Sequence, residues 1–458
     1  MNKEIKNIWQ AQKTFFQNDK TKDYHFRINM LKKLKSLLAE YEEDIFKALK
    51  KDLGRTDYET FIAENVVIYD ELKSAIKNLK KWMKPQKVST PIQLQFAKSK
   101  IHSEPLGQIL IIAPWNYPFH LSLAPLVGAI CAGNCVIIKP SEIAKNASKV
   151  LAKLINDNFQ KEYIHVIEGD KETVNDLLEL KHNLVFFTGG ATVGKIIYQK
   201  AAKFLTPVIL ELGGKCPCIV HKDAQIDVAV KRIIWGKFLN SGQTCLAPDY
   251  LLIHNDIKEE FTEKLKKTLI SFYGKNPLKS KFLSKIVNKK HFNRLSALMK
   301  EGNVVFGGEH NEELLKISPT ILDRINVDSK IMQDEIFGPI LPIIYYSDIN
   351  ETIDIINNIP KALSLYLFTK DKNIKEFIIN NTSSGSIGIN DCLMQAANGN
   401  MPFGGVGESG IGSYHHKYSF NTFSHQKSIM DKKTWFDPSI RYLPYKKENL
   451  KILKKFTT

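Results

Sequence analysis

The sequence predicts an α/β protein built on doubly wound, mostly parallel β-sheets. Short and almost uninterrupted apolar runs alternate with segments of helical period, in one series from Pro105 to Glu211 and in another from Ala247 to about Asn390. Such apolar runs are typical of strands that helices cover on both faces. A chain of 458 residues is also long enough for two or three domains.

Composition narrows the function classes. Hydrophobic residues (43%) and charged residues (25%) occur at ordinary globular levels. A net charge of +17 favours anionic partners, but the chain has no RNA-binding aromatic motif and no helix-turn-helix pattern, so we expect no nucleic-acid partner. The N-terminus does not resemble a signal peptide, no apolar run is long enough for a membrane span, and the six cysteines suggest no disulfide framework. We expect a cytoplasmic protein.

The N-terminal part predicts two helices and a β excursion. Apolar residues recur at helical spacing over 24–54, where Gly54 ends the helix, and again from Glu59 to Met83. Residues 90–103 contain short β-prone runs, which predict a hairpin-like excursion.

The first strand–helix series follows. We predict strands at 107–113, 134–139, 164–167, 183–187 and 207–211, and helices at 121–132, 144–158 and 171–178. Parallel strands of such a sheet end at one edge, where ligands usually bind.

A glycine-rich turn, Thr188-Gly-Gly-Ala-Thr-Val-Gly-Lys195, follows one of these strands, and we predict a helix from Ile196. Glycines and a helix N-terminus offer N–H groups to a phosphate. The turn falls short of a nucleotide-triphosphatase P-loop, because Ile196 stands where Ser or Thr must hold magnesium, and it lacks the Gly-x-Gly-x-x-Gly fingerprint. A plain strand–helix turn is the alternative.

Two residues are candidates for catalysis. Glu211 ends an apolar strand, where a carboxylate is costly unless it is solvated or functional. Cys245 lies in a polar turn between apolar runs, after Ser241 and Gly242, whose small size allows a ligand to approach the backbone. A thiolate is a strong nucleophile, but the alternative for Cys245 is a buried structural cysteine.

Other motifs are weaker. Cys216, Cys218 and His221 superficially suggest a metal site, but Pro217 within an apolar strand argues against their convergence, so we predict no metal.

The second strand–helix series includes the apolar run 335–344 and ends at 386–390, before a glycine-dense loop.

The chain ends in a basic tail that begins at Asp431. Leu450, Leu453 and Phe456 interleave with lysines there. This pattern fits either a short helix on an anionic membrane surface or a solvated basic end, and we favour the solvated end.

Seven motifs, in order, resemble those of the aldehyde dehydrogenase superfamily along nearly the whole chain. They are Pro114-Trp-Asn-Tyr-Pro-Phe119, Lys139-Pro-Ser-Glu142, Phe187-Thr-Gly-Gly190, Leu210-Glu-Leu-Gly-Gly214, Gly242-Gln-Thr-Cys245, Glu335-Ile-Phe-Gly-Pro339 and Pro402-Phe-Gly-Gly405. Ala247-Pro-Asp-Tyr250, Ser413-Tyr-His-His-Lys-Tyr-Ser-Phe420 and Arg441-Tyr-Leu-Pro-Tyr445 resemble the class 3 and fatty-aldehyde branch. Gly190 departs from many relatives, which carry Ser there.

The resemblance implies an aldehyde dehydrogenase-like fold: two doubly wound Rossmann-type parallel-sheet domains and a small β bridging domain used for oligomerisation. We expect an NAD(P)-binding domain at 1–85 and 104–210, a catalytic domain at 211–390, a bridging domain at 86–103 and 391–430, and the basic tail at 431–458. Class 3 members are typically dimers, so a homodimer is implied. The branch and the tail also suggest weak association with the inner face of a membrane.

The same resemblance implies NAD(P)-dependent oxidation of a medium- or long-chain aliphatic or an aromatic aldehyde to the acid. Cys245 would attack the aldehyde to give a thiohemiacetal and then a thioester. The amide of Asn116 and the backbone N–H of Cys245 would hold the oxyanion, and Glu211 would activate water for hydrolysis.

Nine further positions match cofactor contacts of the family: Trp115, Lys139, Glu142, Gly189, Gly190, Val193, Gly194, Glu335 and Phe337. Lys139 and Glu142 would contact the adenosine ribose, and Glu335 and Phe337 the nicotinamide ribose and ring. The glycine-rich turn would lie beneath the pyrophosphate. Glu142 favours NAD, while Lys139 could tolerate the additional phosphate of NADP.

Two other functions are weighed against oxidation. A cofactor-independent cysteine esterase or hydrolase could use the same Cys245, but the cofactor positions would then have no role. A membrane-associated binding protein on an inactive scaffold is disfavoured, because Cys245, Glu211 and Asn116 are all present.

Overall fold

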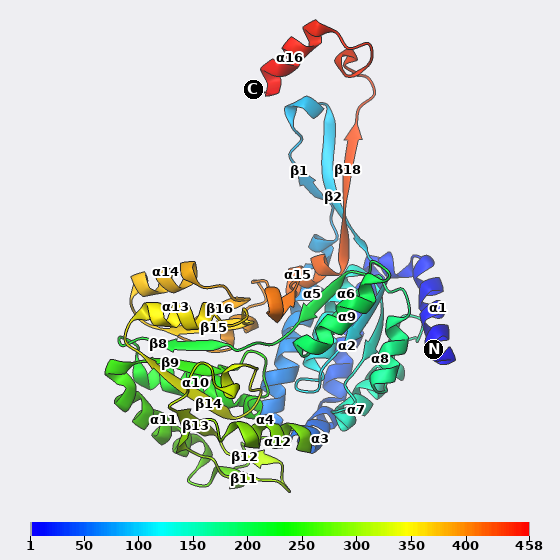
Figure 1. The fold of residues 1–458 in the computed structure, drawn as a ribbon. Helices are drawn as coiled ribbons and strands as arrows, with labels where there is room; N and C mark the ends of the chain where they lie inside the picture. The colour runs from blue at the N-terminus through cyan, green and yellow to red at the C-terminus, as the bar shows by residue number, and fades with distance from the viewer. Residues whose placement is uncertain (1, 458) are drawn as a thin grey trace.

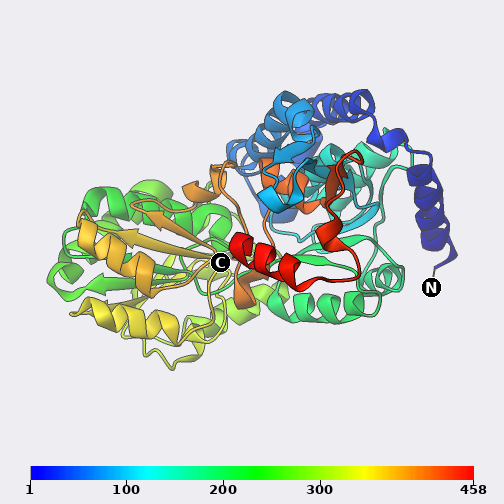
Figure 2. The same cartoon turned by 90° about the horizontal axis from the view of Figure 1, so that it is seen from above.

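The computed structural model describes residues 2–457 and contains two large sheets, each flanked by helices, and a slender arm (Figure 1). Viewed along the arm, the two helix-covered sheets lie beside each other (Figure 2). This arrangement confirms the predicted α/β class with parallel sheets. Within the described residues, every helix is too short or too polar to cross a membrane.

The first sheet has the strand order β17-β7-β6-β3-β4-β5, with β17 antiparallel and the others parallel. Its strands are β3 (Gln108–Ile112), β4 (Cys135–Lys139), β5 (Ile164–Val166), β6 (Leu184–Thr188), β7 (Val208–Glu211) and β17 (Gly410–Ile411). Its helices are α1 (Lys3–Gln17), α2 (Tyr24–Glu40), α3 (Glu42–Leu53), α4 (Asp57–Thr60), α5 (Val66–Trp82), α6 (His120–Ala132), α7 (Lys145–Asn156), α8 (Lys171–Leu178) and α9 (Ala191–Ala202). The strands predicted from their apolar runs are confirmed.

Three helix predictions need correction. The helix predicted at 24–54 is two helices that meet at Tyr41, because three acidic residues after it favour a new helix N-terminus. The helix predicted at 59–83 contains a π-helical turn, Phe61–Asn65, between α4 and α5. Helix α9 begins at Ala191 rather than Ile196, because the extended Gly190 serves as its N-cap. Its first turn, Ala191-Thr-Val-Gly194, consists of small residues, so it lacks the apolar period that predicts a helix.

The second sheet has the order β10-β13-β14-β9-β8-β15-β16, with β10 antiparallel at one edge. Its strands are β8 (Pro217–Val220), β9 (Tyr250–His254), β10 (Asn303–Phe306), β13 (Thr320–Asp323), β14 (Ile340–Tyr346), β15 (Ser364–Phe368) and β16 (Ser386–Ile389). Its helices are α10 (Ile226–Phe238), α11 (Lys258–Tyr273), α12 (Lys289–Leu298), α13 (Ile349–Asn357) and α14 (Lys372–Asn381), and β11 (His310–Asn311) pairs with β12 (Lys316–Ile317) beside it. The apolar run 335–344 forms a strand only from Ile340, and the residues before it form a loop.

The arm is a small antiparallel sheet of β1 (Gln86–Val88), β2 (Ala97–Pro105) and β18 (Ser424–Lys432). The hairpin predicted at 90–103 is confirmed in its second strand, β2, but its first strand, β1, lies before residue 90. Helix α16 (Lys447–Thr457) lies at the far end of the arm (Figure 1). The side chains of Lys455 and Phe456 lie outside the described part of the chain.

Much of the segment 391–430, expected in the bridging domain, packs elsewhere. Cys392 and Leu393 belong to the core of the second sheet. Strand β17 extends the first sheet, and Phe420, in α15 (His416–Thr422), is buried in that sheet's core together with Phe423. Large apolar side chains need such a core, which the thin arm does not provide.

We predict that Phe423→Ala destabilises the first-sheet unit by about 3–5 kcal/mol. Phe423 is fully buried, its ring stacks on Phe186 at 5.8 Å, and it packs against Gly128. The measurement is the urea unfolding midpoint followed by far-UV circular dichroism. The matched control is Phe282→Ala, because Phe282 is 54% exposed. Equal midpoints for the two variants would contradict the placement of Phe423 in the core.

Candidate active site

A cavity of about 350 Å³ lies at the carboxyl ends of first-sheet strands, where it faces the second sheet. It is lined by Pro114, Trp115, Asn116, Thr188, Gly189, Gly190, Glu211, Leu212, Gly213, Cys245, His291, Arg294, Asp334, Glu335 and Phe337. The three residues predicted to be catalytic therefore share one cavity. Of the predicted cofactor positions, Lys139, Glu142, Val193 and Gly194 lie outside this lining.

A left-handed turn places Cys245 at the cavity. Asn240, Ser241 and Gly242 have successive φ values of 52°, 51° and 72° after α10. A Cβ atom on Gly242 would stand 2.3 Å from the Gly338 carbonyl oxygen, so glycine is required for this close approach. Ser241 Oγ donates to the Ser284 carbonyl at 2.6 Å, which anchors the turn.

The surroundings of Cys245 keep its thiol protonated. Burial raises the pKa of Cys245 well above its usual range, and the carboxyl groups of Glu335 and Glu211 raise it further. Hydrogen bonds from the backbone N–H groups of Cys245 and Leu246 oppose this shift. The thiol therefore needs a base before it can attack as a thiolate.

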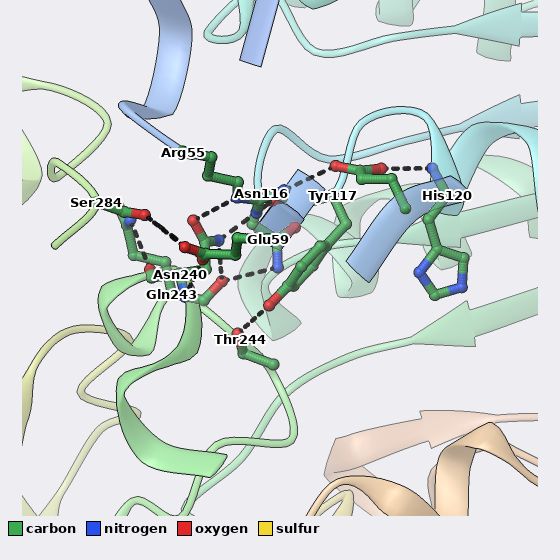
Figure 3. Close-up of polar contacts among 10 residues, drawn as sticks. Arg55, Glu59, Asn116, Tyr117, His120, Asn240, Gln243, Thr244 and Ser284 are labelled. Carbon is green, nitrogen blue, oxygen red and sulfur yellow. Dashed lines mark hydrogen bonds and ion pairs between the residues drawn. The ribbon is translucent and has the colours of Figure 1, made fainter. Parts of the chain in front are cut away.

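Asn116 lies beside the turn, on the loop after β3. Its side-chain Nδ2 donates to the Gln243 carbonyl at 3.1 Å, and its own carbonyl accepts hydrogen bonds from the Arg55 guanidinium and from Asn240 (Figure 3). Both ends of Asn116 are thus held, one by the turn that carries Cys245.

Glu211 ends β7 with an unusual side chain. Both carboxyl oxygens are buried and, among residues 2–457, have no hydrogen-bond partner. Burial raises the pKa of Glu211 well above its usual range. Backbone pairing with Thr188 on one side and Gly410 on the other holds the strand in place. A carboxyl group whose pKa is raised is a stronger proton acceptor than an ordinary one.

The entrance to α9 suits an anionic group. Gly190 caps the helix without any side-chain hydrogen bond, and a Cβ atom built on it would meet no non-neighbouring atom of the described structure within 4 Å. The Thr188 hydroxyl nearby is buried and finds no partner in the described residues. Free N–H groups and the positive end of the helix dipole can bind a pyrophosphate here.

Glu335 lies on the opposite wall. Its carboxyl packs directly on Gly213, where a Cβ atom would stand 2.2 Å from the carboxyl oxygen. Burial and the neighbouring Asp249 raise the pKa of Glu335 to about 8, although a hydrogen bond from Gly214 N–H opposes this. Phe337 meets the Trp115 ring edge-on at 5.4 Å beside it.

The remaining predicted cofactor residues lie nearby. Lys139, at the end of β4, is 2% exposed, and its Nζ forms an ion pair with Glu142 at 2.8 Å. Val193 is exposed on the first turn of α9, and Gly194 packs against Leu212.

The prediction from sequence missed two cavity residues of α12. The His291 ring lies 5.4 Å from that of Trp115, and Arg294 Nη2 donates to the Ile336 carbonyl at 2.7 Å. No local motif surrounds them, so only the folded chain reveals their place. Within the described residues, no cluster of three potential ligands could hold a metal ion.

Comparisons with known proteins identify relatives of this chain. The aldehyde dehydrogenase family model matches residues 2–429. The 4,4'-diaponeurosporen-aldehyde dehydrogenase of Staphylococcus aureus (strain NCTC 8325 / PS 47) is 49% identical over 446 residues, which cover 97% of each chain. The dimeric NADP-preferring aldehyde dehydrogenase of Canis lupus familiaris is 43% identical and covers 96% of this chain and 98% of its own.

A solved structure extends the likeness to three dimensions. It is described as the substrate-bound state of Staphylococcus aureus AldH, is 48% identical, and superposes with a TM-score of 0.97 over 100% of both chains. The chain belongs to the aldehyde dehydrogenase family, among the family 3 members, and is an oxidoreductase that oxidises an aldehyde with NAD or NADP.

Proposed function

We propose that Cys245 is the nucleophile, that Asn116 and the backbone N–H of Cys245 hold the oxyanion, and that Glu211 is the general base. The observation that carries this proposal is their place in one cavity, where Glu211 presents a buried carboxyl group that has no partner in the described structure. A base with a raised pKa suits work near neutral pH.

The chemistry follows from these groups. Cys245 loses its thiol proton to water, and its Sγ adds to the aldehyde carbon. The Asn116 amide donates to the resulting oxyanion, a contact typically worth ~2.7–4 kcal/mol of barrier. The bound dinucleotide supplies the hydride acceptor. Glu211 then removes a proton from the water that hydrolyses the Cys245 thioester to the acid.

We propose that the dinucleotide lies along the entrance of α9. The pyrophosphate would lie over Gly189, Gly190 and the first helical turn, which includes Val193 and Gly194. Lys139 and Glu142 would bind the adenosine ribose. The open space at Gly190 and the free Thr188 hydroxyl support this placement.

The nicotinamide end would lie on the opposite wall. Glu335 would bind the nicotinamide ribose, while Trp115 and Phe337 would flank the ring. The Lys139–Glu142 pair offers both a cation and an acceptor, so NAD and NADP both remain candidates. The esterase alternative has no support in the comparisons.

We also propose the domain assignment given above for the dinucleotide-binding and catalytic parts. Residues 1–85 and 104–210 would form the first, and 211–390 the second. The packing of Phe420 and Phe423 supports assigning 410–423 to the dinucleotide-binding domain, which leaves β18 with 86–103 for the bridge.

A homodimer with a long or aromatic aldehyde as substrate completes the proposal. The dog relative is named as dimeric, and the S. aureus relative is named for 4,4'-diaponeurosporen-aldehyde, which supports both parts. The arm carries exposed apolar side chains such as Ile92 and Trp435, which suit a partner surface. We further propose a cytoplasmic enzyme, with weak contact between its basic tail and the inner face of a membrane as the alternative to a solvated tail.

Gly213→Ala tests the placement of the nicotinamide ribose. The new methyl group would displace the Glu335 carboxyl, so we expect at least a tenfold weaker affinity for NAD or NADP. Phe282→Ala is the control, because its side chain is 54% exposed and lies outside the cavity lining, and its affinity should stay within about threefold. Affinities are measured by quenching of intrinsic fluorescence. The placement is wrong if both variants bind equally well.

Cys245→Ala and Glu211→Gln test the chemistry. We expect Cys245→Ala to form no reduced nicotinamide, and Glu211→Gln to form about one equivalent rapidly and then turn over about 10²–10⁴-fold more slowly. In the parent enzyme, kcat should rise with pH as Glu211 loses its proton, and this dependence should be absent in Glu211→Gln. The readout is stopped-flow absorbance at 340 nm. Undiminished steady turnover by Glu211→Gln would refute the assigned base.

Deletion of 434–458 tests the tail. Helix α16 and the lysines around it lie within this segment, so co-sedimentation of the enzyme with vesicles that contain anionic lipid should be lost on deletion. For the proposed homodimer, sedimentation equilibrium of the full chain should give a mass of about twice 52.2 kDa. Neutral vesicles serve as the control. Binding to neither kind of vesicle by the full chain would contradict the membrane proposal.

A further inference from the structure

Arg55 is a buried cation next to the proposed oxyanion site. It is 1% exposed and lies outside the cavity lining, so it cannot touch a bound aldehyde directly. Its guanidinium nevertheless contacts the two chain segments that carry the proposed oxyanion donors (Figure 3). Neither the family motifs nor the local sequence pattern single it out.

The local fold directs Arg55 inward. Gly54 ends α3 in the left-handed region (φ 69°), which reverses the chain before Arg55. Thr56 then caps α4 by accepting a hydrogen bond from Glu59 N–H. The side chain of Arg55 is thus fixed at the junction of two helices and points between the sheets.

The charge of Arg55 is compensated by Glu64. Arg55 Nη1 lies 2.9 Å from Glu64 Oε1, and both side chains are fully buried. Glu64 Oε2 accepts the His120 backbone N–H at 2.7 Å. Burial raises the pKa of Glu64 to about 7 even though Arg55 opposes the shift. Such pairs are weak contributors to stability, so stability alone explains this one poorly.

The guanidinium bridges the two sides of the site. Arg55 Nε donates to Asn240 Oδ1 at 2.9 Å, and Nη2 donates to the Asn116 carbonyl. Asn240 Nδ2 in turn donates to the carbonyls of Asn116 and Gln243, at 3.2 and 3.1 Å. Arg55 therefore holds the Asn116 peptide and the turn before Cys245 in one fixed relation.

Stacking adds a second link. The Arg55 guanidinium lies 4.4 Å from the centre of the Tyr117 ring, and Tyr117 Oη is 2.5 Å from the hydroxyl of Thr244, which precedes Cys245. A cation over an aromatic face restrains the ring.

We propose that Arg55 is a positioning residue for the oxyanion site, acting through Asn116 and Asn240. This inference rests on the roles proposed for Asn116 and Cys245. Displacement of a donor by about 1 Å can cost 10²-fold in rate. The turn has other anchors, since Glu59 Oε1 accepts Asn240 N–H at 2.7 Å. Loss of Arg55 should therefore loosen the Asn116 peptide without unfolding the turn.

The test variant is Arg55→Met with Glu64→Gln. The double change removes the cation without leaving a lone buried carboxylate, and Gln keeps an acceptor for His120 N–H. We expect the single-turnover rate of reduced-nicotinamide formation to fall 10- to 100-fold, while the affinity for NAD stays within about twofold. Arg55→Lys should retain an intermediate rate, because lysine keeps the charge but not the fork.

Arg27→Met is the matched control. Arg27 is also a buried arginine, 4% exposed, and donates to the carbonyls of Thr21 and Cys131 away from the cavity. Its variant should lose thermal stability but keep the single-turnover rate within about twofold. A comparable loss of rate in Arg27→Met would mean that removal of any buried arginine slows the enzyme, which would overturn the inference.

A double-mutant cycle with Asn116→Ala tests whether Arg55 affects the rate through Asn116. If Arg55 acts through Asn116, its removal should cost less than about threefold in the Asn116→Ala background. An equal cost in both backgrounds would overturn the inference and leave the role of Asn116 intact. A full rate in Asn116→Ala alone would instead refute the proposed oxyanion donor. If Arg55→Met/Glu64→Gln does not fold, the same double-mutant cycle is measured with Arg55→Lys and judged by the same criterion.

Discussion

The contact between the turn 240–243 and the Asn116 peptide is the constraint on which the rest of the site depends. Asn116 follows a strand of the first sheet, whereas the turn leads into a strand of the second. Hydrogen bonds from Asn116 Nδ2 to Gln243 and from Asn240 to Asn116 join them directly. The proposed nucleophile and the proposed amide donor come from different sheets, so this junction determines whether they can act on one carbonyl group.

The buried carboxyl groups of the cavity lower the stability of the fold. Glu211 and Glu335 are both held where burial raises their pKa values, and Glu211 has no partner in the described residues. A buried polar group left unsatisfied costs about 1–3 kcal/mol. We interpret this cost as the consequence of burying a carboxyl group at the cavity, where perturbed carboxyls are typical of catalysis. Strand pairing on both sides of Glu211 makes this cost in stability tolerable.

The C-terminal part of the chain contributes to both sheets and to the arm. Between the second-sheet core at Cys392 and the arm at Ser424, the chain crosses the first sheet as β17 and buries Phe420 and Phe423 there. Because Gly410 pairs with Glu211, this crossing also supports the proposed base. The arm itself exposes apolar and basic side chains at its end, and its role lies outside the cavity.

The sequence by itself determined the α/β class, most strands, and the residues with recognisable chemistry such as Cys245 and Glu211. Apolar runs and polar turns are local features of the sequence. A buried strand needs an apolar run whichever strands it pairs with. Tertiary structure decided where α9 begins, that His291 and Arg294 line the cavity, and that Arg55 reaches Asn116 and Asn240. Those facts depend on contacts between segments up to 185 residues apart, and no local period or motif records which segments will meet.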